Sequence, residues 1–116
     1  MRTILKSFGI ITACGIAWSA HAGDKPSPET VALWDKDCAS CHAKDGKGDT
    51  KMGKKLGAKD YTDPTVQEKL KDEAASKAIQ GDLKDKDDKT LMKPSKDLTH
   101  AQVKAVLAYL RTFKKP

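Results

Sequence analysis

The chain has 116 residues, which is the length of one small domain. Only 5% of the residues are aromatic and 33% are charged, so the hydrophobic core is thin, and a chain of this kind commonly needs a cofactor, a metal or a disulfide to fold stably. The formal net charge is +6, but acidic residues lie among the basic ones, which argues against nucleic-acid binding.

The first 22 residues have the pattern of a cleaved secretory signal. Arg2 and Lys6 give a positive start, residues 8–18 are largely apolar, and Ala-His-Ala at 20–22 matches the small-x-small cleavage pattern. The apolar run is about 11 residues long, which is too short to span a bilayer comfortably. We therefore expect export, cleavage after Ala22, and a mature domain over 23–116 without a transmembrane segment.

Two other interpretations of the N-terminal stretch stay open. It could be retained as a membrane anchor, or Cys14, which follows Ile-Thr-Ala, could become a lipidated N-terminus. If the signal is cleaved, the mature chain loses two basic residues and no acidic one, and its net charge falls to +4.

The first helix of the mature domain is predicted to begin at Ser27-Pro28, because serine is a good N-cap and proline is favoured at the first helical position. Val31, Trp34, Cys38 and Cys41 follow at three- and four-residue intervals, which indicates one apolar helix face. We expect Trp34 to be a core residue. The helix carries both cysteines at its C-terminal end.

The segment Cys38-Ala39-Ser40-Cys41-His42 is the attachment pattern of a covalently bound c-type haem. Positions i and i+3 share a helix face, so both thiols can reach the two vinyl groups along one side of a porphyrin. The histidine next to the second cysteine then supplies a neutral imidazole to the iron. We predict one haem c, with Cys38 and Cys41 as thioethers and His42 as the proximal iron ligand.

Three other uses of a cysteine pair at this spacing are a disulfide, a thiol–disulfide oxidoreductase site and a zinc site. A disulfide would close a tiny loop and add little stability. A thiol–disulfide oxidoreductase expects a strand–helix–strand context that the sequence lacks. A zinc site needs a fourth ligand and usually a second paired motif.

The middle of the chain contains a predicted loop, a helix and a second loop. Residues 43–59 are rich in lysine and glycine without long periodicity, so we expect a loop past the proximal side of the haem. A second helix is expected from Asp63-Pro64 to Ile79, with Gly81 just past its end. Residues 82–89 are highly charged, which indicates a solvated loop.

Met92 is the candidate sixth ligand of the iron. It precedes Lys93-Pro94, and the residue before a proline avoids the helical region, so an extended segment across one haem face is expected. Methionine also fills gaps in cores, but a haem with a vacant iron site favours ligation. Met52 and His100 are the less favoured candidates for the same position.

The last predicted helix begins with the capping box Thr99-His100-Ala101-Gln102. Its apolar stripe consists of Val103, Val106, Leu107 and Leu110. There is no internal repeat and no alternating strand pattern. The predicted fold class is all-α, with three main helices and loops wrapped around one covalently bound haem.

These residues together resemble a class I c-type cytochrome, the small monohaem bacterial periplasmic kind, over essentially the whole mature chain. The resemblance rests on the 38–42 motif, Asp-Gly-Lys-Gly-Asp at 45–49, Met-Lys-Pro at 92–94 and Ala-Tyr-Leu at 108–110. It implies the cytochrome c fold, in which the first and last helices cross and Trp34 meets the face of Val106, Leu107 and Tyr109. It also implies Met92 as the distal ligand.

One departure from this family concerns the proximal histidine. Many members have a proline about a dozen residues later, whose carbonyl accepts the second ring N–H, but here no proline lies between His42 and Pro64. Such acceptors orient a metal ligand and tune the metal. We expect a backbone carbonyl within 53–61 to take this place.

An iron with both His42 and Met92 as ligands has no open position, which predicts a one-electron carrier and not an enzyme. The expected partners are redox proteins, such as a membrane-bound oxidase, a reductase or a periplasmic dehydrogenase, and the expected location is the periplasm. We expect a monomer. The alternative function is a haem-based sensor or gas-binding protein with a labile sixth ligand.

A basic docking surface is a further hypothesis. Six lysines and two aspartates lie in the predicted loop over residues 43–59, a third aspartate follows it directly, and two more lysines flank Met92. The lysines are Lys44, Lys47, Lys51, Lys54, Lys55, Lys59, Lys93 and Lys96, and the aspartates are Asp45, Asp49 and Asp60. A surface of this kind could steer an acidic partner, or it could be ordinary solvated lysine.

Overall fold

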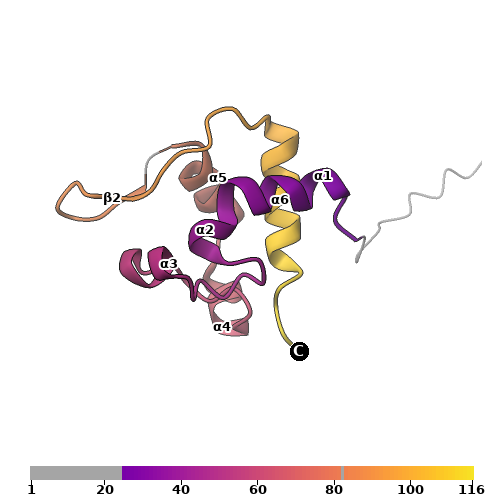
Figure 1. The fold of residues 1–116 in the computed structure, drawn as a ribbon, viewed down its shortest axis with the longest axis horizontal. Helices are drawn as coiled ribbons and strands as arrows, with labels where there is room; N and C mark the ends of the chain where they lie inside the picture. Colours follow the sequence, from indigo (N-terminus) through magenta and orange to yellow (C-terminus); the bar gives the residue numbers. More distant parts are fainter. Residues whose placement is uncertain (1–24, 82) are drawn as a thin grey trace, which may run out of the picture.

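The computed structural model describes residues 25–81 and 83–116, which form mainly helices and one short hairpin (Figure 1). The predicted signal, its cleavage after Ala22 and the alternative at Cys14 lie outside these residues. Within the two described ranges, no helix is long and apolar enough to cross a membrane. The elements in chain order are α1 Pro28–Leu33, the π-helical segment η1 Trp34–Cys38, α2 Ala39–His42, α3 Lys51–Leu56, α4 Pro64–Lys69, α5 Asp72–Gln80, β1 Leu83–Lys84, β2 Thr90–Met92 and α6 His100–Arg111.

The first helix starts where the sequence predicts. The Ser27 side chain accepts a hydrogen bond from the Thr30 amide at 3.1 Å, and Pro28 follows the cap. The α-helix then widens into the π-helical segment η1 before it continues as α2. Pieces of π-helix inside α-helices are rare and often lie at functional sites. Here the segment begins at buried Trp34 and ends at buried Cys38.

Residues 43–59, predicted to be a loop, contain the short helix α3. Thr50 caps it by accepting from the Gly53 amide at 2.9 Å, and the same hydroxyl donates to the carbonyl of Ser40 at 2.8 Å. The loop prediction was therefore wrong for six residues. The sequence of α3 has no apolar stripe from which a helix could be predicted. The helix is held instead by the Thr50 hydroxyl and by its caps.

The predicted second helix is interrupted. It forms α4 and α5, with Leu70 in an extended conformation between them (φ −72°, ψ 118°). The following charged stretch, predicted to be a solvated loop, contributes to an antiparallel hairpin in which Leu83 faces Met92 and Lys84 faces Thr90. The hairpin is too short to have an alternating pattern in the sequence.

The core lies where the first and last helical segments cross, as predicted (Figure 1). Trp34, Val103 and Val106 are each 1% exposed, and Leu107 and Leu110 belong to the same buried cluster. The rings of Trp34 and Tyr109 meet edge-on at 5.7 Å. The expected capping box is also present, with Thr99 and Gln102 bonded to each other's backbone amides.

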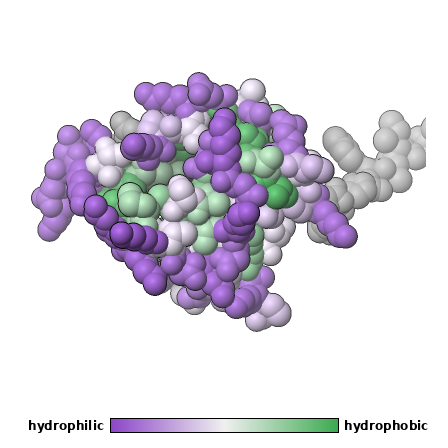
Figure 2. Space-filling view, viewed as in Figure 1, coloured by the Kyte–Doolittle hydropathy of each residue, from purple (hydrophilic) through white to green (hydrophobic). Residues whose placement is uncertain are grey.

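Charged and polar side chains cover most of the face seen in Figure 2, and apolar groups show between them near the middle of that face. The thin core predicted from composition is consistent with this view, since only eight hydrophobic residues of the described ranges are buried.

Candidate functional site

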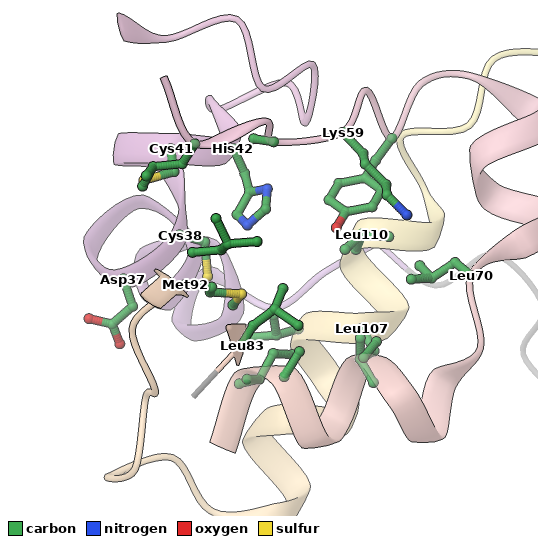
Figure 3. A pocket seen from close by; sticks show the side chains of 18 of the residues that line it. Asp37, Cys38, Cys41, His42, Lys59, Leu70, Leu83, Met92, Leu107 and Leu110 are labelled. Atoms are coloured by element: carbon green, nitrogen blue, oxygen red, sulfur yellow. The ribbon is translucent and has the colours of Figure 1, made fainter. Parts of the chain in front are cut away.

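A cavity of about 380 Å³ lies between the end of the first helical segment, α5, α6 and the hairpin (Figure 3). Its volume is within the range of about 300–1,000 Å³ that is common for cofactor and ligand sites. The walls are largely apolar. Those apolar lining residues are Leu56, Leu70, Ala74, Ala75, Ala78, Ile79, Leu83, Leu91, Val106, Leu107 and Leu110.

Both predicted attachment cysteines line this cavity as free thiols. Cys38 is 8% exposed, and its burial, with a smaller effect from the Asp37 charge, raises the pKa of the thiol to about 12. Cys41 is half-buried on the next turn. The two cysteines thus lie at the same wall, and neither is engaged in a disulfide.

His42 also lines the cavity, and its imidazole is neutral in this environment. Burial lowers the pKa of the ring, and the buried Nδ1 atom has no hydrogen-bond partner among the described residues. A backbone carbonyl within 53–61 was expected to accept from this ring, and the structure does not place one there. The expected acceptor is therefore absent among the described residues.

The backbone directly after His42 is held in an uncommon conformation. Ala43 has φ +62° and ψ 162°, a region that residues with a Cβ rarely adopt and that often marks functional sites. The indole N–H of Trp34 donates to the Ala43 carbonyl at 2.9 Å, and the Gly48 amide donates to the His42 carbonyl at the same distance. These bonds fix the direction in which the chain leaves the histidine.

Two aromatic rings lie against the imidazole. The ring centroid of Trp34 is 5.9 Å from that of His42, and the centroid of Tyr61 is 5.4 Å from it. Burial raises the pKa of the Tyr61 phenol, so its hydroxyl stays protonated. Only the fold reveals this contact, because no local pattern in the sequence links Tyr61 to a residue 19 positions earlier.

The structure separates the three candidates for the sixth ligand. Met92, at the end of β2, is half-buried and lines the same cavity as His42 (Figure 3). Met52 is 45% exposed on α3 and does not line the cavity. His100 is exposed in the first turn of α6 and is also absent from the lining. Met92 is therefore the candidate that the fold brings to His42.

The wall formed by α5 was not identified from the sequence as part of a site. Ala74, Ala75 and Ala78 lie one helical turn or less apart and all face the cavity. Their short side chains leave room for a flat ring system, and Leu70 and Ile79 extend the apolar surface. Alanine occurs in helices for many reasons, so only the packing of α5 against α6 at the cavity wall reveals this role.

The residues around the cavity fit a covalently bound haem. Two free thiols three positions apart, a neutral imidazole beside them, a thioether and apolar walls are the donor set and surroundings that such a group requires. The unpartnered ring nitrogen of His42 is consistent with an imidazole kept available for a ligand or a second-shell partner.

Comparisons with known proteins agree with this fit. The family model described as "Cytochrome c" matches residues 29–114, a range that includes every residue of the cavity wall. Among solved structures, the chain is similar to one described as "KustC0563 c-type cytochrome", with 32% identity and a TM-score of 0.62 over 74% of this chain and 98% of that one. Comparison with curated proteins gives no significant match.

Proposed function

Because the chain belongs to the cytochrome c family, whose cofactor is a covalently attached haem c, we propose that it is a one-electron carrier in which Cys38 and Cys41 hold the haem and His42 and Met92 bind its iron. The observation that carries the proposal is that the imidazole and the thioether enter one apolar cavity beside two free thiols (Figure 3). When bound, the haem supplies reversible one-electron chemistry.

The role of His42 follows from its protonation state and from its fixed backbone. A neutral imidazole is a good iron ligand, and burial keeps it neutral. The bond from Trp34 to the Ala43 carbonyl and the packing of Tyr61 limit the orientations that the ring can adopt. A ligand held in this way changes little when the iron changes its oxidation state, which favours fast electron transfer.

The role of Met92 is to close the sixth position. A thioether is a soft ligand that favours the ferrous state, and His/Met ligation raises the reduction potential. The apolar wall acts in the same direction, because a medium of low polarity penalises the extra charge of the ferric form. With both positions occupied by side chains, a substrate or gas has no free site, and this distinguishes a carrier from the alternative of a haem-based sensor.

The location and the partners are part of the same proposal. The predicted signal, cleaved after Ala22, would deliver the chain to the periplasm, where membrane-bound oxidases, reductases and periplasmic dehydrogenases are suitable partners. Lys59 and Lys93 line the cavity and are both exposed, which supports docking of an acidic partner at its rim.

The test is the absorption spectrum of the ferric holoprotein, produced with haem maturation machinery. We expect the weak far-red sulfur-to-iron band in the wild type and in Met52→Ala, and its loss in Met92→Ala. Intact mass under reducing conditions confirms that the haem stays covalently attached in all three proteins. A wild type without the band, or a Met92→Ala variant that keeps it, would refute the ligand set, and rapid carbon monoxide binding by the ferrous wild type would favour the sensor.

A further inference from the structure

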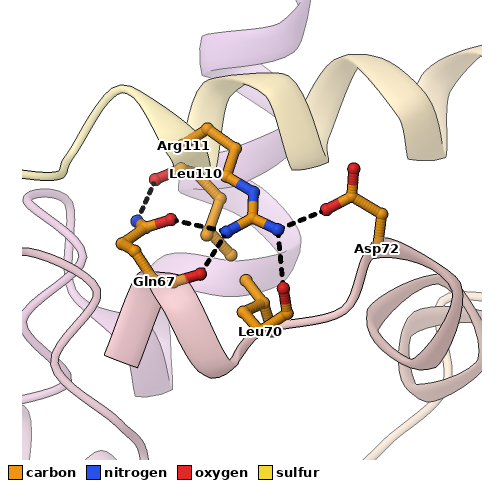
Figure 4. A network of polar contacts seen from close by, with 5 residues as sticks. All are labelled: Gln67, Leu70, Asp72, Leu110 and Arg111. Atoms are coloured by element: carbon orange, nitrogen blue, oxygen red, sulfur yellow. Dashed lines mark hydrogen bonds and ion pairs between the residues drawn. The ribbon is translucent and has the colours of Figure 1, made fainter. Parts of the chain in front are cut away.

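The interruption between α4 and α5 is bridged by one arginine from the last turn of α6 (Figure 4). The Arg111 guanidinium donates to the carbonyls of Gln67 at 2.6 Å and Leu70 at 2.8 Å, and to the Gln67 side-chain oxygen at 3.0 Å. It also pairs with Asp72 at 2.6 Å. One side chain thus joins the end of α4, the start of α5 and α6.

The side chain of Gln67 completes this network. Gln67 is 4% exposed, and its amide nitrogen donates to the carbonyls of Tyr61 at 2.7 Å and Leu110 at 3.0 Å, while its oxygen accepts from Arg111. A buried amide is costly unless its groups are bonded, and fully bonded networks specify one geometry. The network therefore defines where the backbone at Tyr61 and Leu70 lies.

The interruption is itself linked to Arg111. In a continuous helix, the carbonyls of Gln67 and Leu70 would accept from the amides four residues later, at Lys71 and Ala74. Here both carbonyls accept from the guanidinium instead. The extended Leu70 lines the cavity, and the arginine holds its carbonyl, so the arginine supports the backbone of this wall.

The network also reaches the proximal side of the cavity. The carbonyl of Tyr61 is held by Gln67 and its amide donates to Gly46 at 2.8 Å, so its backbone is anchored on both sides. The ring of the same residue lies 5.4 Å from that of His42. We propose that Arg111 and Gln67 are positioning residues that hold Tyr61 against the proximal imidazole and Leu70 in the cavity wall, and so keep water away from the iron.

The inference rests on the proposed function only in taking His42 as an iron ligand. It adds two residues outside the cavity lining whose removal should change the haem environment. An arginine that only stabilised the fold would lower the resistance to denaturant without altering the potential of the molecules that remain folded.

The experiment compares holoprotein Arg111→Met with Lys104→Met, which removes an exposed lysine from the same helix. Two quantities are measured, the reduction potential and the amide hydrogen exchange of Tyr61. In Arg111→Met we expect a lower potential and an exchange faster by roughly tenfold, the effect of losing one hydrogen bond of ordinary strength, and in Lys104→Met we expect neither change. Arg111→Lys keeps the charge but lacks the fork that binds two carbonyls, so it should shift both quantities in the same direction.

The proposal is overturned if Arg111→Met and Arg111→Lys lose global stability while the potential and the Tyr61 exchange match those of Lys104→Met. If Arg111→Met does not fold, Arg111→Lys decides the question alone. Failure of the proposed ligand set is recognised separately, because it would remove the far-red band from the wild type. Amide exchange at Tyr61 reports on the network of Arg111 and Gln67 whichever residue binds the iron.

Discussion

The turn after His42 depends on a glycine that packs directly against an aromatic ring. Gly46 has φ +77°, and a Cβ at this position would lie 2.5 Å from Cδ2 of Phe113. The Phe113 ring in turn lies 5.1 Å from that of Trp34, in the core. Gly57 has nearly the same backbone, φ +74°, but a Cβ there would meet nothing within 4 Å. The two glycines therefore form a matched pair for the substitution by alanine.

The expected costs differ because only one site is crowded. A left-handed backbone costs an alanine about 1–2 kcal/mol, and the smaller entropy of the unfolded chain returns about 0.4–1 kcal/mol. Gly57→Ala should thus lower the free energy of unfolding by between about 0 and about 1.6 kcal/mol. Gly46→Ala must also displace the Phe113 ring, and overpacking of this kind adds about 1–3 kcal/mol.

Urea unfolding of the holoprotein, followed by helical circular dichroism, measures both costs. We expect Gly46→Ala to exceed Gly57→Ala by about 1–3 kcal/mol, and this excess to shrink when Gly46→Ala is introduced into a Phe113→Leu background, since contacting residues are not additive. Equal destabilisation by the two alanines, or an excess that is unchanged in the Phe113→Leu background, would refute the role assigned to Phe113.

Two further predictions concern pH and ionic strength. Hydrogen bonds from the Thr62 hydroxyl (2.6 Å) and amide (2.8 Å) lower the pKa of Asp60 below its ordinary 3.8. These bonds therefore stabilise the folded state at pH values above 3.8, and the stabilisation is lost as the pH falls through the lowered pKa. Thr62→Val should therefore lower Tm more at neutral pH than at pH 3, and an equal loss at both would contradict this. The rate of electron transfer to an acidic redox protein should fall as salt is added. The double variant Lys59→Gln/Lys93→Gln should weaken this dependence, and the control Lys104→Gln should not. Wild-type stopped-flow rates that do not change with ionic strength would refute the steering hypothesis.

Several features of the site are readable from short stretches of sequence. The spacing of Cys38, Cys41 and His42 is a local property, because three residues of helix place both thiols on one face whatever surrounds them. The caps at Ser27 and Thr99 depend on bonds that span three residues. The extended backbone at Met92 lies two residues before a proline, in the segment where the sequence predicted it.

Other features depend on residues that are distant in the chain. The helix predicted over 63–79 has a continuous apolar pattern, yet it is interrupted at Leu70, whose carbonyl accepts from Arg111, 41 positions later. Helix α3 is likewise hidden from the sequence, since the Thr50 hydroxyl that caps it also bonds to the carbonyl of Ser40 in α2.

The cofactor chemistry, the caps at Ser27 and Thr99 and the candidate ligands can be predicted from the sequence, because each of these is encoded within a few consecutive residues. Which of those candidates line one cavity depends on the fold. The fold brought Met92 to the cavity of His42, left Met52 and His100 outside it, and placed Tyr61 on the imidazole. The physical reason is that the position of a side chain in a small cavity depends on hydrogen bonds and packing between elements, which local patterns do not contain.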